Sequence, residues 1–350
     1  MMVLAAIIGL SVVIVVHEMG HFFAAKASGA RVDEFGIGFP PRLFGWRRGE
    51  TEYTLNAIPF GGFVRIHGEG REDGNEQDAA RSFATKSLGK KLGILVAGVT
   101  MNFLFGWLVL ATSFMVGTPE HLVIAGVSSG SPAAEVALET GDVITRVSWG
   151  DTELVDPVPV DDFMALARQS VGTPLSLTVE RGSAPREAVL IGRVSPPEGE
   201  GPLGIALAPV GAAPQPFFGA LGTAFLQSVT TLRDVIAGFG RLVGGVFTDP
   251  DILKEVSGPV GIVALTAQSG ALGVVYFFQL LALISLNLVV LNLIPFPALD
   301  GGRMLVVLVE RLIRRTVPRR VELAVNGIGF AALLALMAVV TVQDVVKLWG

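Results

Sequence analysis

The chain has 350 residues, of which 51% are hydrophobic and only 16% are charged, and its mean hydropathy is +0.61. Soluble domains carry roughly 25% charged residues, so this composition is typical of a membrane protein. A net charge of -5 argues against a nucleic-acid partner, and the absence of cysteine excludes disulfides and thiolate-bound metals.

The first apolar segment predicts a transmembrane helix over residues 3–25. It resembles the core of a signal peptide, but no basic residue precedes it and no small-residue cleavage site ends it. Instead the run continues into His17-Glu18-Met19-Gly20-His21 and the apolar residues that follow. We therefore expect the segment to be retained.

Three further segments predict membrane spans over about 92–116, 273–294 and 324–342, which makes four. An even number places both termini on one side. Ten Lys or Arg residues lie between 28 and 91 and six lie in the short loop 301–320, whereas 118–272 holds eight in a much longer stretch. By the positive-inside rule the two basic loops are cytoplasmic, and both termini and residues 118–272 face outward.

Residues 121–208 lose the membrane pattern and predict a small domain of short strands with two helices. Gly130-Ser131-Pro132-Ala133-Ala134-Glu135 is typical of a helix start, and Gly141-Asp142-Val143-Ile144 of a turn into a strand. This pattern resembles a PDZ domain, which we assign to 118–210.

The following segment, 211–272, is interpreted as a connector. Its apolar stretch 214–247 is interrupted by Arg233, Asp234 and Arg241, so it is either an amphipathic helix in the outer interface or an additional span. The interfacial helix preserves the charge topology and is preferred.

The motif His17-Glu18-Met19-Gly20-His21 predicts a zinc site. On a helix its histidines stand at i and i+4, on one face and close enough for one metal ion to bridge. Glu18 is not a ligand in this arrangement but can act as general base toward the attacking water. Histidines and a glutamate inside an apolar span are costly unless they are paired or bind a ligand, which favours the zinc interpretation.

Asp300 is the best candidate for the third ligand. His67 and His121 lie outside the spans and are interpreted as surface histidines. Asp300 follows the third span in Asn292-Leu293-Ile294-Pro295-Phe296-Pro297-Ala298-Leu299-Asp300-Gly301-Gly302, where the prolines should end the helix and the glycines permit a tight return. At ~1.5 Å per residue His17 lies roughly 24 Å into the first span, at the leaflet where the third span emerges.

Alternating residues in Thr51–His67 predict a β-hairpin. We expect Tyr53–Ala57 to pair with Phe63–His67 around the turn Pro59-Phe60-Gly61-Gly62. The alternative is a cytoplasmic loop packed under the helices.

The chain resembles a site-2 protease, in particular the RseP-like branch that carries an outward-facing PDZ domain. The resemblance rests on the His17–His21 motif, on the segment from Asn292 to Gly302, and on their order. Weaker matches are Phe35-Gly36-Ile37-Gly38-Phe39, Ile58-Pro59-Phe60-Gly61-Gly62-Phe63-Val64 and Ser257-Gly258-Pro259-Val260-Gly261. Departures are Gly98-Val99-Thr100-Met101-Asn102-Phe103, where the family usually has proline after the glycine, and the presence of one PDZ-like domain where some relatives have two.

The resemblance implies an α-helical integral membrane protein with four transmembrane helices, a membrane-associated β-hairpin region and one extracytoplasmic PDZ-like α+β domain. Residues 1–117 and 273–350 would form the two catalytic membrane halves. It also implies one zinc ion, a bacterial inner-membrane location, substrate contacts at Asn287 and Asn292, and addition of an unwound substrate strand to the hairpin.

The implied activity is hydrolysis of peptide bonds within or near the transmembrane segment of single-span proteins, such as anti-sigma factors or signal-peptide remnants. A zinc transporter or sensor is the first alternative, but the intramembrane charges form one cluster and not a pathway. A membrane-tethered PDZ scaffold is the second, and it leaves Glu18 without a role.

Overall fold

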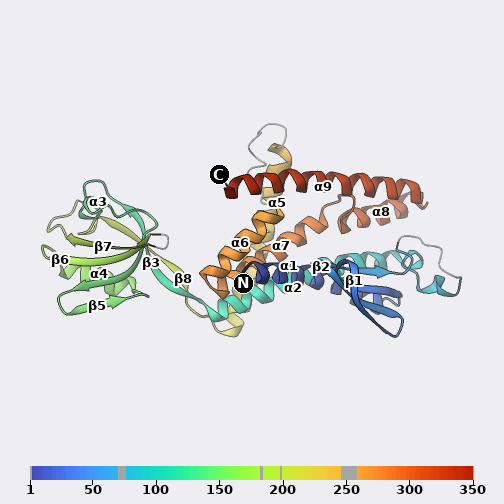
Figure 1. Ribbon diagram of the computed structural model, residues 1–350, viewed down its shortest axis with the longest axis horizontal. Helices are drawn as coiled ribbons and strands as arrows, with labels where there is room; N and C mark the ends of the chain where they lie inside the picture. Colours follow the sequence, from blue (N-terminus) through green and yellow to red (C-terminus); the bar gives the residue numbers. More distant parts are fainter. Residues whose placement is uncertain (1, 70–75, 182–183, 198, 246–257, 350) are drawn as a thin grey trace. The chain divides into compact units, whose positions relative to one another are not determined.

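The computed structural model describes residues 2–69, 76–181, 184–197, 199–245 and 258–349. They form two compact units, a helical unit of Met1–Ser113 with Phe217–Gly350 and a sheet unit of Phe114–Pro216. Figure 1 labels the elements of both.

Four helices of the described residues are long and apolar enough to cross a membrane, as the sequence predicted. A helix is stable in the lipid bilayer because its backbone N–H and C=O groups are hydrogen-bonded to one another. Apolar side chains such as Leu4 and Ile328 remain exposed on their outer faces, as contact with lipid requires. The helices are α1 (Met2–Ala27), α2 (Leu88–Val116), α7 (Val274–Leu293) and α9 (Arg319–Trp349), the span in α9 being Arg320–Val346.

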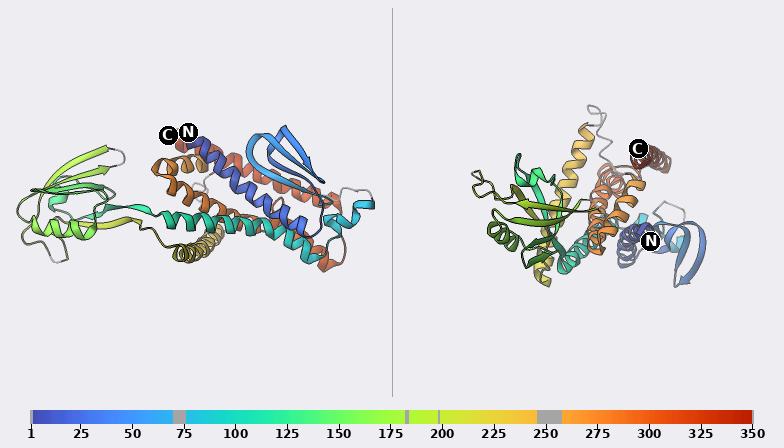
Figure 2. Two further views of the ribbon diagram at one scale, coloured as in Figure 1. Left: turned by 90° about the horizontal axis from the view of Figure 1, so that it is seen from below. Right: turned by 60° about the vertical axis from the view of Figure 1, so that its left-hand side comes forward.

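Glycines allow α1, α2 and α7 to pack closely. A Cβ at Gly20 of α1 would lie 2.3 Å from the carbonyl oxygen of Ala97 in α2, and one at Gly106 of α2 would lie 2.9 Å from the Leu286 side chain in α7. Small residues bring helix backbones together where lipid offers no hydrophobic drive for association. As Figure 2 shows, α1 and α2 approach each other toward the C-terminal end of α1.

The segment 211–272, expected as a connector, contains two helices of the helical unit, α5 (Phe217–Gly245) and α6 (Pro259–Leu272). Helix α5 packs on α2, where Trp107 donates a hydrogen bond to the Leu221 carbonyl, while Arg233, Asp234 and Arg241 are exposed. It is not among the four candidate spans. Helix α6 packs against α1, α7 and α9.

The predicted hairpin pairing is wrong. Strands β1 (Val32–Arg48) and β2 (Thr51–Ile66) pair so that Phe35 lies opposite both Tyr53 and Val64, and Tyr53 lies also opposite Trp46. Part of β1 therefore separates the two segments that we expected to pair. The sequence showed a local alternation, but residues 34–37 of β1 supply partners to both halves of β2. The segment 62–66 is left as an edge of this sheet.

The remaining elements of the helical unit are α8 (Asp300–Ile313) and two 3-10 turns at Glu76–Arg81 and Phe83–Thr85.

The sheet unit has short strands and two helices, as expected. Its strands run in the order β7-β6-β4-β3-β8, with β5 paired to β4. Ser131 caps the first helix by accepting a hydrogen bond from the Ala134 N–H, and Phe163 of the second helix is buried in the core with Leu175 and Leu177. The elements are β3 (Thr118–Val127), α3 (Pro132–Glu135), β4 (Val143–Trp149), β5 (Thr152–Val155), α4 (Val160–Gln169), β6 (Pro174–Arg181), β7 (Ala184–Ile191) and β8 (Ile205–Ala212).

Candidate active site

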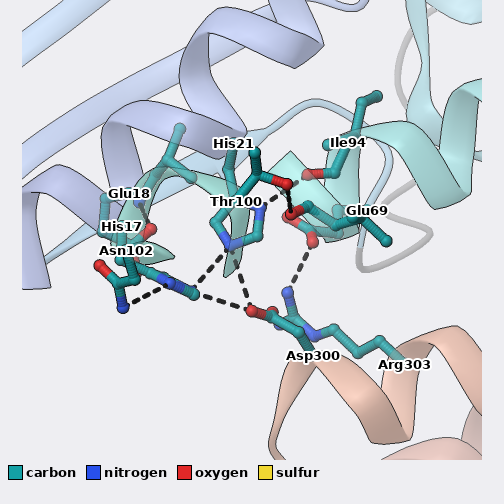
Figure 3. A network of polar contacts seen from close by, with 11 residues as sticks. His17, Glu18, His21, Glu69, Ile94, Thr100, Asn102, Asp300 and Arg303 are labelled. Carbon is teal, nitrogen blue, oxygen red and sulfur yellow. Dashed lines mark hydrogen bonds and ion pairs between the residues drawn. The ribbon is translucent and has the colours of Figure 1, made fainter. Parts of the chain in front are cut away.

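His17 and His21 lie one turn apart on α1, and both side chains are buried. Their spacing places both imidazoles on one face, with the two Nε2 atoms 3.0 Å apart and the rings edge to face. Figure 3 shows both rings directed toward the same point.

Asp300 joins the histidines from the other end of the chain. It is the first residue of α8, and its Oδ2 lies 2.9 Å from His17 Nε2 and 3.3 Å from His21 Nε2. Burial raises the pKa of this carboxyl and the contacts with the two imidazoles lower it, with a net shift below the ordinary value.

The glycines after Asp300 have a different role from the one expected. Gly301 and Gly302 lie inside the first turn of α8, and the left-handed residue of the preceding turn is Ala298. A Cβ on Gly301 would lie 2.2 Å from the Ile294 carbonyl oxygen, and one on Gly302 equally close to that of Phe296. The glycines thus let α8 pack against the end of the preceding segment.

The three side chains fit a metal ion. One ligand atom from each of His17, His21 and Asp300 lies within 4.8 Å of the others. His21 Nδ1 lies 2.8 Å from the Ile94 carbonyl oxygen, which can only accept, so Nδ1 carries the proton. A neutral His21 then presents the lone pair of Nε2 to the site, which is the tautomer that a metal requires.

Gly98 of α2 gives the imidazoles their room. A Cβ at this position would lie 2.4 Å from His21 Nε2 and 2.9 Å from His17 Cε1. In the sequence Gly98 stands out only as part of a motif. Nothing along the chain indicates that this face of α2 meets the histidines, because the contact is made between helices.

Glu18 lies beside the cluster and outside the set of converging ligand atoms. Its Oε2 accepts a hydrogen bond from the Val64 N–H at 3.1 Å. The side chain lines a cavity of about 60 Å³ together with His21, Asp300 and four further residues, Val64, Ile66, Glu69 and Arg303. A carboxylate in this place can exchange a proton with a small molecule in the cavity.

An ion pair at the rim of this cavity was not anticipated. Arg303 Nη1 lies 2.6 Å from Glu69 Oε1, and both residues line the small cavity and a neighbouring one of about 470 Å³. Arg303 stands one turn after Asp300 on α8, as Figure 3 shows. The spacing from Asp300 could have indicated in the sequence that Arg303 lies near the site. Its partner Glu69 could not be predicted in this way, because Glu69 comes from the segment after β2.

The other candidates have no hydrogen bond to the ligand cluster among the described residues. Asn287 donates to the Leu283 carbonyl of its own helix. The hydrogen bonds found among the described residues link neither Asn287 nor Asn292 to the two histidines or Asp300. His67 pairs with Asp33, and His121 pairs with Asp156.

Comparison with known proteins agrees with this chemistry. The model of peptidase family M50 matches residues 5–336. A Clostridium perfringens protein is 33% identical over 357 residues, with 99% of each chain covered. Zinc metalloprotease RasP of Shouchella clausii is 30% identical and the regulator of sigma-W protease RasP of Bacillus subtilis is 27% identical, again over 99% of each chain. The match over nearly the whole chain shows that this membrane protein belongs to peptidase family M50, the site-2 proteases, and is a zinc metalloprotease.

Proposed function

We propose that the chain hydrolyses peptide bonds within or near the transmembrane segment of single-span membrane proteins, with His17, His21 and Asp300 as the zinc ligands. The observation that carries the proposal is the convergence of their three ligand atoms beside Glu18. Two imidazoles and a carboxylate leave one position of a tetrahedral zinc open, as in catalytic sites.

Zinc bound there would polarise the scissile carbonyl and make water acidic enough to attack at neutral pH. Glu18 takes the proton of the attacking water and returns it to the leaving amine. The Val64 N–H positions Glu18 Oε2 for both transfers. A cavity of about 60 Å³ has room for little water beside these groups.

The edge of β2 suits an unwound substrate. A helical peptide bond is shielded because its carbonyl is hydrogen-bonded, so the substrate must be extended before cleavage. Residues 62–66 pair with β1 on one side, and Val64 and Ile66 line the same cavity as Glu18. An extended peptide added along this edge would pass the general base, with main-chain hydrogen bonds replacing those of the helix. Asn287 and Asn292 are proposed to contact it near the scissile bond.

The decisive experiment is reconstitution in lipid vesicles with a model transmembrane peptide. Glu18→Gln should retain zinc and lose cleavage, because the ligands remain while the proton acceptor is gone. Glu187→Gln, on an exposed position of β7, is the matched control and should cleave normally. Equal cleavage by Glu18→Gln and wild type would refute the role of Glu18.

We further propose that residues 118–210 form a PDZ-like domain on the outer side of the inner membrane, with both termini. The charge distribution of the loops supports this orientation. Because the chain has no cysteine, the labelling of a single introduced cysteine shows on which side of the membrane that residue lies. Val194→Cys, at a highly exposed position, should react with an impermeant thiol reagent outside intact cells, and Arg315→Cys should not. The reverse pattern would overturn the orientation.

The outer domain is proposed to restrict access by size. Bulky outer domains of intact substrates would collide with it, while substrates trimmed by an earlier cleavage would pass. Controllers of sigma factors fit this class, since one relative is named for regulating sigma-W. Deleting 121–208 should permit cleavage of untrimmed substrate and preserve that of trimmed substrate. If the deletion abolishes cleavage of trimmed substrate in a zinc-loaded protein, the domain captures substrates instead.

A further inference from the structure

Asn102 is a buried amide on α2 whose side chain contacts a proposed metal ligand. It is fully buried, and its Nδ2 lies 3.3 Å from His17 Nδ1. Its Oδ1 has no partner among the described residues. The backbone carbonyl at this position accepts a hydrogen bond from Ser285 of α7 at 2.8 Å, which ties α2 to α7 here. Among the described residues the contact with His17 is the one polar interaction of this side chain, and a buried amide with a single partner is unfavourable.

The orientation of this amide decides which nitrogen of His17 carries the proton. If Nδ2 donates to Nδ1, the proton of a neutral imidazole lies on Nε2. Nε2 is the atom that faces Asp300 and His21, and with a proton it cannot bind a metal. If the amide is turned by 180°, Oδ1 accepts from an Nδ1–H, and the lone pair of Nε2 is free. The amide has nearly the same shape in both orientations, so its partner selects between them.

His21 supplies an independent precedent within the same site. Its Nδ1 faces the Ile94 carbonyl oxygen, and so its Nε2 is available to a metal. Ile94 and Asn102 are eight residues apart, which is about two turns of α2. One face of one helix can thus supply an oxygen acceptor to each of the two histidines.

We propose that Asn102 is a positioning residue: in the zinc-loaded enzyme its Oδ1 accepts the hydrogen bond of His17 Nδ1–H, fixing the metal-binding tautomer and the ring orientation. This rests on the ligand set given under the proposed function. Outer partners of this kind typically change metal affinity 10- to 100-fold when they are removed.

The test compares two near-isosteric variants. Asn102→Leu keeps the volume but removes the acceptor, and should weaken zinc binding about 10- to 100-fold in chelator competition on the purified protein. Asn102→Asp can only accept when it is ionised, and should bind zinc at least as tightly as wild type. A packing role predicts the opposite order, because an apolar helix tolerates leucine better than aspartate. Thr112→Val, which removes a side-chain hydrogen bond elsewhere on α2, is the control and should leave affinity unchanged.

Any order other than loss in Asn102→Leu with retention in Asn102→Asp overturns the proposal. Nitrogen NMR of histidine-labelled wild type provides a readout that does not depend on how the variants fold, since the chain has four histidines. Zinc-loaded protein should show His17 protonated at Nδ1, and a bare Nδ1 overturns the proposal. Full zinc content in His17→Ala would instead refute the ligand set itself, so the two failures are distinguishable.

Discussion

A single methyl group at Gly98 should displace the metal site. The added carbon would lie 2.4 Å from His21 Nε2, about 1 Å inside an ordinary contact distance of ~3.5 Å. The neighbour cannot yield easily, because His21 is held by the Ile94 carbonyl and stands on a helix packed against α2. Zinc–nitrogen bonds are about 2.0–2.1 Å long and tolerate deviations of roughly 0.2 Å.

A displacement of about 1 Å is several times larger than the deviation that a zinc–nitrogen bond tolerates. We therefore expect Gly98→Ala to lower zinc affinity at least ~100-fold, which corresponds to about 3 kcal/mol. The assay is zinc competition with a chelator, combined with thermal unfolding of the metal-free protein in detergent. Gly93→Ala is the matched control, because it adds the same methyl to the same helix with no atom within 4 Å. Wild-type affinity in Gly98→Ala would refute the packing argument.

Three further outcomes are expected. Asp300→Ala should lower zinc occupancy, because two imidazoles remain of three ligands, and full zinc in the purified variant would place the third ligand elsewhere. Arg181→Leu should lower the thermal midpoint of the full chain at pH 7, because the buried carboxylate of Asp142 then keeps only its hydrogen bond from the Glu139 N–H. The Arg181 guanidinium holds the pKa of Asp142 below its ordinary value, so the contribution is present above about pH 3.9 and is lost as the pH falls further. The difference in thermal midpoint between variant and wild type should shrink in that range. Asp344→Ala should lower the thermal midpoint in detergent, since Asp344 of α9 accepts the N–H groups of Gly258 and Gly261 at the start of α6, and a cap of this kind is worth about 1 kcal/mol.

The membrane helices and the histidine pair were predictable because their signals are local. A run of about 20 apolar residues meets the thickness of a bilayer wherever it stands in the chain. His17 and His21 share a face because four residues make about one turn of helix. Asp300 could be placed near them because the depth of each span follows from its length and direction.

The sheet was predicted less well. Residues 51–67 alternate as a hairpin does, but both halves of β2 take their partners from residues 34–37 of β1. Alternation shows which face a residue occupies and not which strand lies beside it. The same limit applies to the proposed role of the edge at Val64, which depends on the place of α1 beside the sheet.

The sequence by itself determined that the protein lies in a membrane, where its four spans are, and which kind of metal chemistry it performs. The first two depend on composition and on the length of apolar runs, and the third depends on a spacing of one turn of helix. Only the tertiary structure showed that His17 and Asp300, which are 283 residues apart, lie together. It also decided which further residues surround the predicted ligands: Gly98 and Asn102 face the histidines from α2, and Arg303 lines the same cavity. Such contacts arise when one helix packs on another. Because this packing depends on the shapes of both surfaces, it cannot be predicted from either segment alone.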